Sequence, residues 1–139
     1  MREILEERIR LWLEDSESNV EYAEELEGRW AIRMRQETRD ATTVWFDVGE
    51  RSLQFEAYVM PASPTPADVH RQALVRNMRS WRAFFAVDSE GAVVVRGRLA
   101  FGQVTLEELD LALGEVYEMV EVAFRAMIRA GFPNRENSG

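Results

Sequence analysis

The sequence predicts an α+β fold in which helices cover mainly one face of an antiparallel sheet. Three segments place apolar residues every three or four positions, as amphipathic helices do, and five others place them at every second position, as half-buried strands do. The alternating segments form two groups with short turn-like linkers, which is typical of antiparallel hairpins. The predicted order is therefore α-β-β-β-α-β-β-α, which is typical of an α+β protein rather than of a doubly wound sheet.

The predicted elements follow from these periods. Helices are expected at residues 1–15, 66–79 and 105–132, and strands at residues 29–35, 43–48, 52–60, 81–87 and 92–101. Residues 16–28 are polar and acidic, so we expect a loop there, with no more than a short extended piece at residues 20–22. A chain of 139 residues fits one domain. We assign residues 1–132 to that domain and residues 133–139 to a flexible C-terminal tail.

The last predicted helix carries the strongest signal in the chain. Thr105 and Glu108 have the spacing of a capping box, and Gly131 followed by Pro133 is typical of a helix end. One face of this helix is apolar along its whole length and is expected to pack against the sheet. Two of its residues are expected in the core beneath three aromatic side chains: Val120 and Phe124 beneath Trp30, Phe46 and Phe55.

Two apolar residues of the same helix, Leu111 and Val122, do not fit that face. They are eleven residues apart, about three turns, and so share a line on another side of the helix. Two interpretations remain open. The first helix covers them within one molecule, or they form, with Arg125 nearby, the centre of a two-fold contact between two copies.

Composition and charge argue against several classes of partner. The formal net charge is −8, which disfavours nucleic acid and anionic membrane surfaces because both are bound mainly through basic groups. No apolar run approaches the ~20 residues that span a bilayer, and the first residues are too acidic for a signal peptide. A cytoplasmic location is therefore expected. The absence of cysteine excludes disulfides, thiolate nucleophiles and cysteine metal sites.

The predicted order of elements resembles that of the class I type III secretion chaperones. The wording of several segments is similar to the actinobacterial branch of the YbjN-type family, whose members share that fold, over nearly the whole chain. The matching stretches are residues 29–35 (RWAIRMR), 43–46 (TVWF), 58–61 (YVMP), 74–77 (LVRN) and 108–111 (ELDL). The resemblance implies a non-enzymatic, chaperone-like or regulatory protein that binds peptides and dimerises. It supplies no catalytic residue.

The residues themselves also offer no reaction. His70 is the only histidine, so a catalytic triad or a multi-histidine metal site is not expected. The glutamates at the start of the last helix are explained by the helix dipole, and no glycine-rich loop precedes a helix to hold phosphate. We therefore expect no catalytic residue, no metal and no cofactor.

The outer face of the predicted sheet is the most distinctive surface. Its alternation places six candidate peptide-binding residues on the side away from the long helix: Arg33, Arg35, Trp45, Tyr58, Arg96 and Arg98. Cross-strand pairs with acidic residues would make this an ordinary solvated sheet face. Alternatively, the aromatic rings and guanidinium groups bind an acidic peptide.

The leading hypothesis is therefore a non-enzymatic chaperone-like or regulatory adaptor that binds a partner polypeptide and forms a homodimer. The alternative is a small-molecule-binding regulatory, or sensory, domain with a pocket between sheet and helices. A long open groove would favour the polypeptide, whereas a closed cavity with a few polar groups would favour the small ligand.

Overall fold

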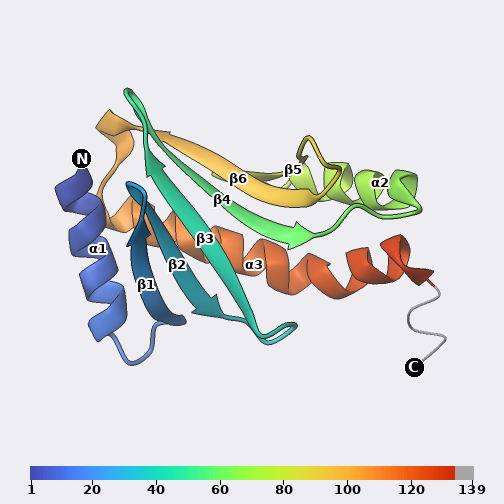
Figure 1. Ribbon diagram of the computed structural model, residues 1–139, viewed down its shortest axis with the longest axis horizontal. Coiled ribbons are helices and arrows are strands. Elements are labelled where there is room, and N and C mark those ends of the chain that lie inside the picture. The colour runs from blue at the N-terminus through green and yellow to red at the C-terminus, as the bar shows by residue number, and fades with distance from the viewer. Residues whose placement is uncertain (134–139) are drawn as a thin grey trace.

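The computed structural model describes residues 1–133, which form an antiparallel sheet with helices packed against it (Figure 1). The helices are α1 (Arg2–Glu14), α2 (Pro66–Asn77) and α3 (Leu106–Gly131), and a short 3₁₀ turn, η1, spans Phe101–Gln103. The strands are β1 (Val20–Leu26), β2 (Arg29–Arg35), β3 (Ala41–Val48), β4 (Ser52–Met60), β5 (Ala83–Val87) and β6 (Val93–Ala100). The tail was predicted at residues 133–139, and all of it after Pro133 lies outside the described residues.

The strands form one sheet in the order β1-β2-β3-β4-β6-β5, and every neighbouring pair is antiparallel. The first four strands are a meander, after which α2 and the β5–β6 hairpin follow and β6 returns to pair with β4. The α+β class with an antiparallel sheet is thus confirmed. The long helix and the predicted strands are present, with small differences at their ends.

One strand was missed. Residues 16–28 were predicted to be a loop, but seven of them form β1, which pairs with β2 along its length. Its two-residue turn, Glu27 and Gly28, has positive φ at both positions (53° and 82°), the geometry that matches the twist of a tight hairpin. Only Val20 of β1 is buried. An edge strand with so little buried surface lacks the apolar alternation by which the other strands were recognised.

The helices lie on one side of the sheet and α3 runs along the length of the molecule (Figure 1). In that view α1 is at one end and α2 is at the other, and both pack against α3. The core lies between the sheet and α3, whose fully buried residues include Leu109, Val116, Val120 and Met127. The sequence is therefore organised around α3, because each of the other layers contacts it.

The core is centred slightly differently from the prediction. Val120 is buried as expected, but Phe124 and Trp30 are only partly buried and lie at its margin. The Arg39 guanidinium covers the Phe124 ring at 4.9 Å. The aromatic centre is instead made by three side chains in series: Trp12 lies 6.3 Å from Phe46, which lies 5.8 Å from Phe55.

Both ends of α3 also differ in detail from the expected motifs. The Thr105 hydroxyl accepts the Glu108 N–H at 3.0 Å, as predicted, but the Glu108 carboxylate does not return to the cap and binds Arg82 instead. Gly131 is the last helical residue and is buried against Met60 and Val69. A Cβ on Gly131 would lie 2.7 Å from Met60 Cε, so close packing and not a left-handed turn explains this glycine.

Candidate functional site

The sheet register brings most of the predicted peptide-binding residues onto one face. Trp45, Glu56, Arg96 and Phe84 lie in one row across β3, β4, β6 and β5. A neighbouring row carries Asp47, Gln54 and Arg98, and the Tyr58 side chain is exposed on β4. The sequence thus predicted correctly which side chains share this face.

The half of the face on β1–β3 has internal partners. The Arg33 Nε donates to Glu21 at 3.1 Å, and the Arg35 guanidinium donates to the backbone oxygen of Ser18 at 3.3 Å. The Arg29 guanidinium lies 4.6 Å from the centre of the Trp45 ring. These contacts satisfy the charges locally, so this half resembles an ordinary solvated sheet face.

The half of the face on β5 and β6 is different. Arg96 and Arg98 are exposed, and their guanidinium groups have no hydrogen bond or ion pair within residues 1–133. Together with Trp81 and Phe84 they line a hollow of about 560 Å³. Aromatic rings beside unpaired guanidinium groups are the combination that the peptide-binding prediction requires.

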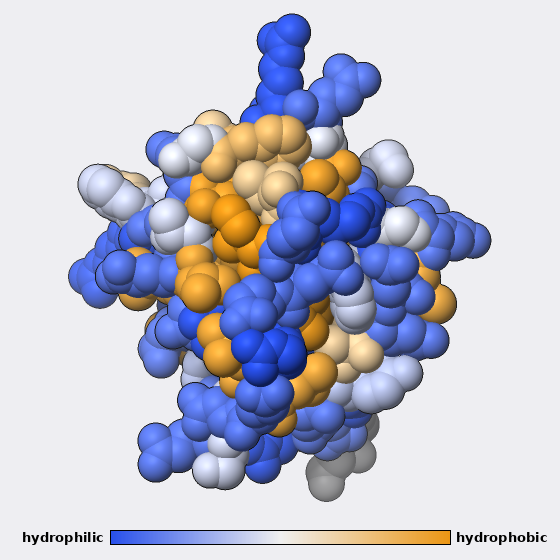
Figure 2. Space-filling model, turned by 90° about the vertical axis from the view of Figure 1, so that its left-hand side faces the viewer, coloured by the Kyte–Doolittle hydropathy of each residue, from blue (hydrophilic) through white to orange (hydrophobic). Residues whose placement is uncertain are grey.

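The exposed apolar residues of α2 and β5 extend this surface around the edge of the sheet. Six large ones occur within fourteen residues of chain: Leu74, Val75, Met78, Trp81, Phe84 and Val87. Met78 and Trp81 are 87 % and 79 % exposed. The opposite end, which carries α1, is mostly hydrophilic, and apolar side chains show there on both sides of a charged ridge (Figure 2). We call the six residues the α2–β5 surface.

Sequence reasoning did not identify the α2–β5 surface, because the apolar positions of the helix predicted at residues 66–79 do not show which of them the core covers. The structure buries only Val69 and Ala73 of α2. A signal was present, since the adjacent pair Leu74 and Val75 gives this short helix a wider apolar arc than one buried face needs.

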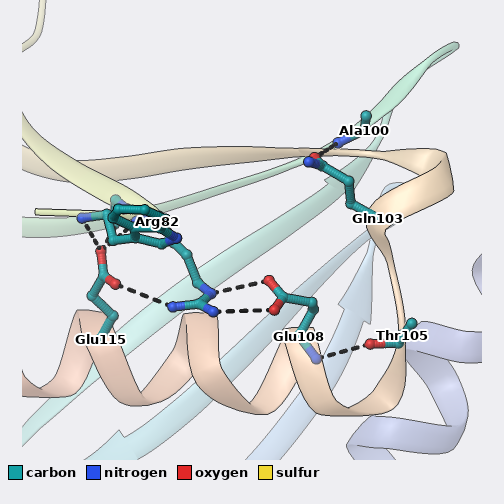
Figure 3. Close-up of polar contacts among 8 residues, drawn as sticks. Arg82, Ala100, Gln103, Thr105, Glu108 and Glu115 are labelled. Carbon is teal, nitrogen blue, oxygen red and sulfur yellow. Dashed lines mark hydrogen bonds and ion pairs between the residues drawn. The ribbon is translucent and has the colours of Figure 1, made fainter.

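The edge of β5 is closed by side chains. Asn77 pairs with Phe85 through two hydrogen bonds, accepting its N–H at 2.8 Å and donating to its carbonyl oxygen at 3.0 Å. One carboxylate oxygen of Glu115 accepts the N–H groups of Trp81, Arg82 and Ala83 at 3.1, 2.6 and 2.8 Å (Figure 3). These contacts occupy backbone groups with which another strand could otherwise pair.

Arg82 locks the same region to the start of α3. Its guanidinium donates to both oxygens of Glu108 at 3.0 Å and lies 3.7 Å from Glu115 (Figure 3). These hydrogen bonds lower the pKa of Glu108 below its usual value and raise the pKa of Arg82. The start of β5 is therefore held against α3 by these contacts, although the apolar side chains of the α2–β5 surface are exposed.

The arginine side chains in the first part of the chain have partners, whereas most of those in the second part do not. Each of the seven up to Arg39 contacts an acceptor or an aromatic ring. Among the nine arginines from Arg51 to Arg129, only Arg82 has such a side-chain contact within the described part of the chain. Most of the unpaired guanidinium groups in the described residues thus lie on or near α2, β6 and the end of α3.

The proposed dimer residues are all exposed. Leu111 is 42 % and Val122 is 65 % exposed, and Arg125 is exposed as well. The interpretation in which α1 covers Leu111 and Val122 is therefore wrong. Leu111 lines a hollow between α1 and α3, whereas Val122 lines a groove between α2 and α3. The two-fold contact stays a prediction.

The described residues offer little for metal chemistry. His70 is partly buried on α2, and residues 1–133 hold no group of three or more histidine or acidic side chains placed to bind a metal ion. None of the helices in this range is long and apolar enough to cross a membrane.

Comparison with known proteins assigns the family. Residues 6–129 match the model of YbjN, described as "Putative bacterial sensory transduction regulator". The chain belongs to the YbjN family. This match covers nearly all of the fold, including α2, β5 and α3, so the α2–β5 surface is part of the YbjN domain itself.

Mycobacterial relatives of the chain are described as uncharacterized proteins. The YbjN-family chain is 35 % identical over 86 residues to one from Mycobacterium tuberculosis, which covers 61 % of this chain and 47 % of the relative. It is 30 % identical over 105 residues to one from Mycobacterium leprae, covering 75 % and 57 %. The chain spans about half the length of the curated relatives it matches.

Two solved structures share the fold. YbjN from E. coli has a TM-score of 0.54 at 16 % identity, with 84 % of this chain and 85 % of that one covered. A chain of the heterodimeric ExoU–SpcU complex from the type III secretion system of Pseudomonas aeruginosa has a TM-score of 0.54 at 15 % identity, with 73 % and 84 % covered. The resemblance to type III secretion chaperones is thus confirmed for the fold.

Proposed function

We propose that this YbjN-family chain is a non-enzymatic, chaperone-like adaptor that binds a partner polypeptide at its α2–β5 surface. The observation that carries the proposal is the set of six exposed apolar side chains between Leu74 and Val87. Isolated exposed apolar residues are common, but six large ones on and between two elements that contact each other are typical of an interaction site. Trp81 and Met78 are side chains that interfaces favour.

The neighbouring arginines support the same proposal. Arg96 and Arg98 lie beside Trp81 and Phe84, and their charges are not used within the described residues. A polypeptide with apolar and acidic side chains would contact both kinds of group. The same face of the sheet also carries the other predicted peptide-binding residues, Tyr58, Arg33, Arg35 and Trp45. The exposed Tyr58 side chain adds apolar area to it.

The form of the surface favours a polypeptide over a small ligand. The hollows beside β5 are open grooves of about 740 and 560 Å³, not enclosed cavities. Because Asn77 and Glu115 occupy backbone groups of the edge strand, a partner would bind mainly through side chains and not by adding a strand. One structure with this fold is a chain of a heterodimeric complex, which fits a protein partner.

Site-specific photo-crosslinking tests this proposal. The photoreactive residue p-benzoylphenylalanine replaces Trp81 in one variant and Tyr22, an exposed aromatic residue on the opposite edge strand, in a matched control. Irradiation in the native cytosol should give discrete protein adducts from position 81 and far fewer from position 22. Equal labelling from both positions would contradict a binding surface at α2 and β5.

A second measurement uses the chain's own fluorescence. Trp12 is buried and Trp30 and Trp45 are partly buried, so Trp81 is the most exposed of the four tryptophans. Addition of a captured partner should shift the emission to shorter wavelength and reduce quenching by acrylamide. Both changes should disappear in Trp81→Ala. If they persist in that variant, the partner contacts another part of the molecule.

A further inference from the structure

The groove between α2 and α3 lies on the helical side of β5, opposite the hollow that contains Arg96 and Arg98. Its volume is about 740 Å³, and its apolar lining comes from both helices and the edge strand: Val75, Phe85, Met119, Val122 and Ala123. Val75 and Val122 are largely exposed in the free protein. Two helices with an apolar channel between them are shaped to receive a third.

The α2 wall of the groove is basic. Arg71, Arg76 and Arg79 line it, and none of their guanidinium groups has a hydrogen bond or an ion pair to any residue of the described chain. The Nε of Arg76 and the Oε1 of Gln72 are buried without a partner. Buried polar atoms normally have hydrogen-bond partners, so the hydrogen bonding of this wall is unsatisfied in the free protein.

The α3 wall is acidic but unevenly so. Glu115 already accepts hydrogen bonds from three backbone N–H groups, and its negative charge is paired with the guanidinium of Arg82. Glu118 is exposed and has no partner within residues 1–133. A bound segment would therefore meet unsatisfied positive charge on one side and a single free carboxylate on the other.

We propose, on the basis of the proposed function, that this groove binds an amphipathic helix of the partner polypeptide whose flank facing α2 is acidic. The apolar face of that helix packs on Val75, Met119 and Val122. Its carboxylates pair with Arg71, Arg76 and Arg79, since guanidinium groups form strong paired hydrogen bonds with carboxylates. Arg71 and Arg76 are five residues apart, roughly 8 Å along α2, so carboxylates one to two turns apart can reach both.

Charge also argues against a second copy as the occupant. The chain carries a net charge of −8, so two copies repel each other at long range. α1, whose flanks carry several glutamates, has its own apolar face buried by Leu5, Ile9 and Trp12. A short helix from another protein carries far less negative charge than a second copy of net charge −8, and its apolar face is free to pack in the groove.

The test uses two fluorescent synthetic helices of about 15 residues with the same leucine face. One carries glutamate along its flank and the other carries lysine, and anisotropy reports binding to the full chain. The acidic helix should bind at least about tenfold more tightly than the basic one. Its affinity should fall as salt rises from about 0.05 M to about 0.5 M, because exposed ion pairs are screened.

Charge variants locate the binding. Arg76→Glu and Arg79→Glu should each weaken the acidic helix at least about tenfold. Glu118→Gln should strengthen it, because the free carboxylate on the opposite wall is removed. Arg51→Glu is the matched control, since Arg51 is also exposed and unpaired but lies outside the groove, and it should change little. Circular dichroism checks that each variant is folded, and Arg79, which follows the end of α2, serves if Arg76→Glu is not.

Three results would overturn the inference. The first is equal affinity for the acidic and basic helices, and the second is an unchanged affinity of folded Arg79→Glu for the acidic helix. The third is a molecular mass in solution that is half as large for Arg79→Glu as for the wild type. The last would show that a second copy occupies the groove. The proposed function is separable, because adducts from position 81 report partner binding whether or not the acidic helix binds.

Discussion

Glu121 holds the turn between β2 and β3 against α3 through one carboxylate oxygen. That oxygen accepts the side-chain amide of Gln36 at 2.6 Å, the N–H groups of Glu37 and Thr38 at 2.7 and 3.1 Å, and the Thr38 hydroxyl at 3.2 Å. Burial raises the pKa of Glu121, but these four hydrogen bonds outweigh burial and hold the pKa below its usual value.

Removal of this carboxylate should be costly. Glu121→Ala leaves several donors without their acceptor, and we expect the free energy of unfolding to fall by about 1–3 kcal/mol. Glu118→Ala, one turn earlier on α3 and exposed, should change it by no more than about 0.5 kcal/mol. Urea unfolding of both variants measures the difference. Similar losses in the two would mean that Glu121 is not an anchor.

The lowered pKa of Glu121 and of Glu108 predicts the response to acid. A carboxyl group whose pKa is lower in the folded than in the unfolded protein stabilises the fold above the unfolded value, near 4.5. That stabilisation is lost as the pH falls through the folded pKa. The free energy of unfolding should therefore decrease below about pH 4.5, and less steeply in Glu121→Ala than in the wild type. Identical slopes would argue against the assigned hydrogen bonds.

Gly97 is a position where the absence of a side chain matters. It pairs with Phe55 across β4 and β6, and a Cβ would run into the Phe55 ring and the carbonyl oxygen of Arg82. Gly97→Ala should therefore lower the free energy of unfolding by about 1–3 kcal/mol. Gly114→Ala, where α3 has open space, should instead raise it by roughly 0.5–1 kcal/mol. Thermal unfolding that gave both changes the same sign would contradict this packing.

At the scale of elements, the sequence predicts best where one face of a segment is buried and its ends carry local signals. β2, β4 and α3 meet that condition, and their ends agree with the prediction to within one or two residues. β1 does not, because its side chains are mainly exposed and it is held by pairing with β2. The prediction for α2 was incomplete for a different reason. This helix has more apolar residues than the core buries, and periodicity does not show whether an apolar residue is buried in the core or exposed on the surface.

The candidate site was predictable in part. Alternation correctly placed Trp45, Arg96 and Arg98 on one face, because side-chain direction in a strand is a local property. Which charges remain unpaired depends on contacts between segments far apart in the chain. The pairing of Arg82 with Glu108 is such a contact, and it replaced the capping box that the spacing of Thr105 and Glu108 suggested.

The hydroxyl of Thr105 still caps α3, so its removal can be predicted. Thr105→Ala should lower the free energy of unfolding by about 1 kcal/mol, because the Glu108 N–H loses its acceptor. Thr105→Ser keeps the hydroxyl and is the control. Denaturant titration of the two variants should separate them clearly. A loss of similar size in Thr105→Ser would assign the effect to the methyl group and not to the cap.

At the scale of the whole molecule, the homodimer is open to a direct test. Leu111 lies outside the groove between α2 and α3, so Leu111→Glu probes the two-fold contact without touching the proposed helix site. Because Leu111 is exposed, the variant should fold normally. If two copies meet along α3, light scattering should give twice 16.1 kDa for the wild type and a single copy for the variant. A wild type that runs at 16.1 kDa at micromolar concentration would exclude the dimer.

The position of α3 has a consequence for synthesis of the chain. The inner face of the sheet is made by residues 20–100, but the helix that covers it is translated only afterwards. At roughly 5–20 residues per second, the 26 residues of α3 take about one to five seconds to follow. During that interval Phe46, Phe55 and Val95 have no partner from α3, and the nascent chain presents an apolar sheet to the ribosome surface and to cellular chaperones. A protein that we propose to shield apolar segments of others would itself need such shielding before its last helix arrives.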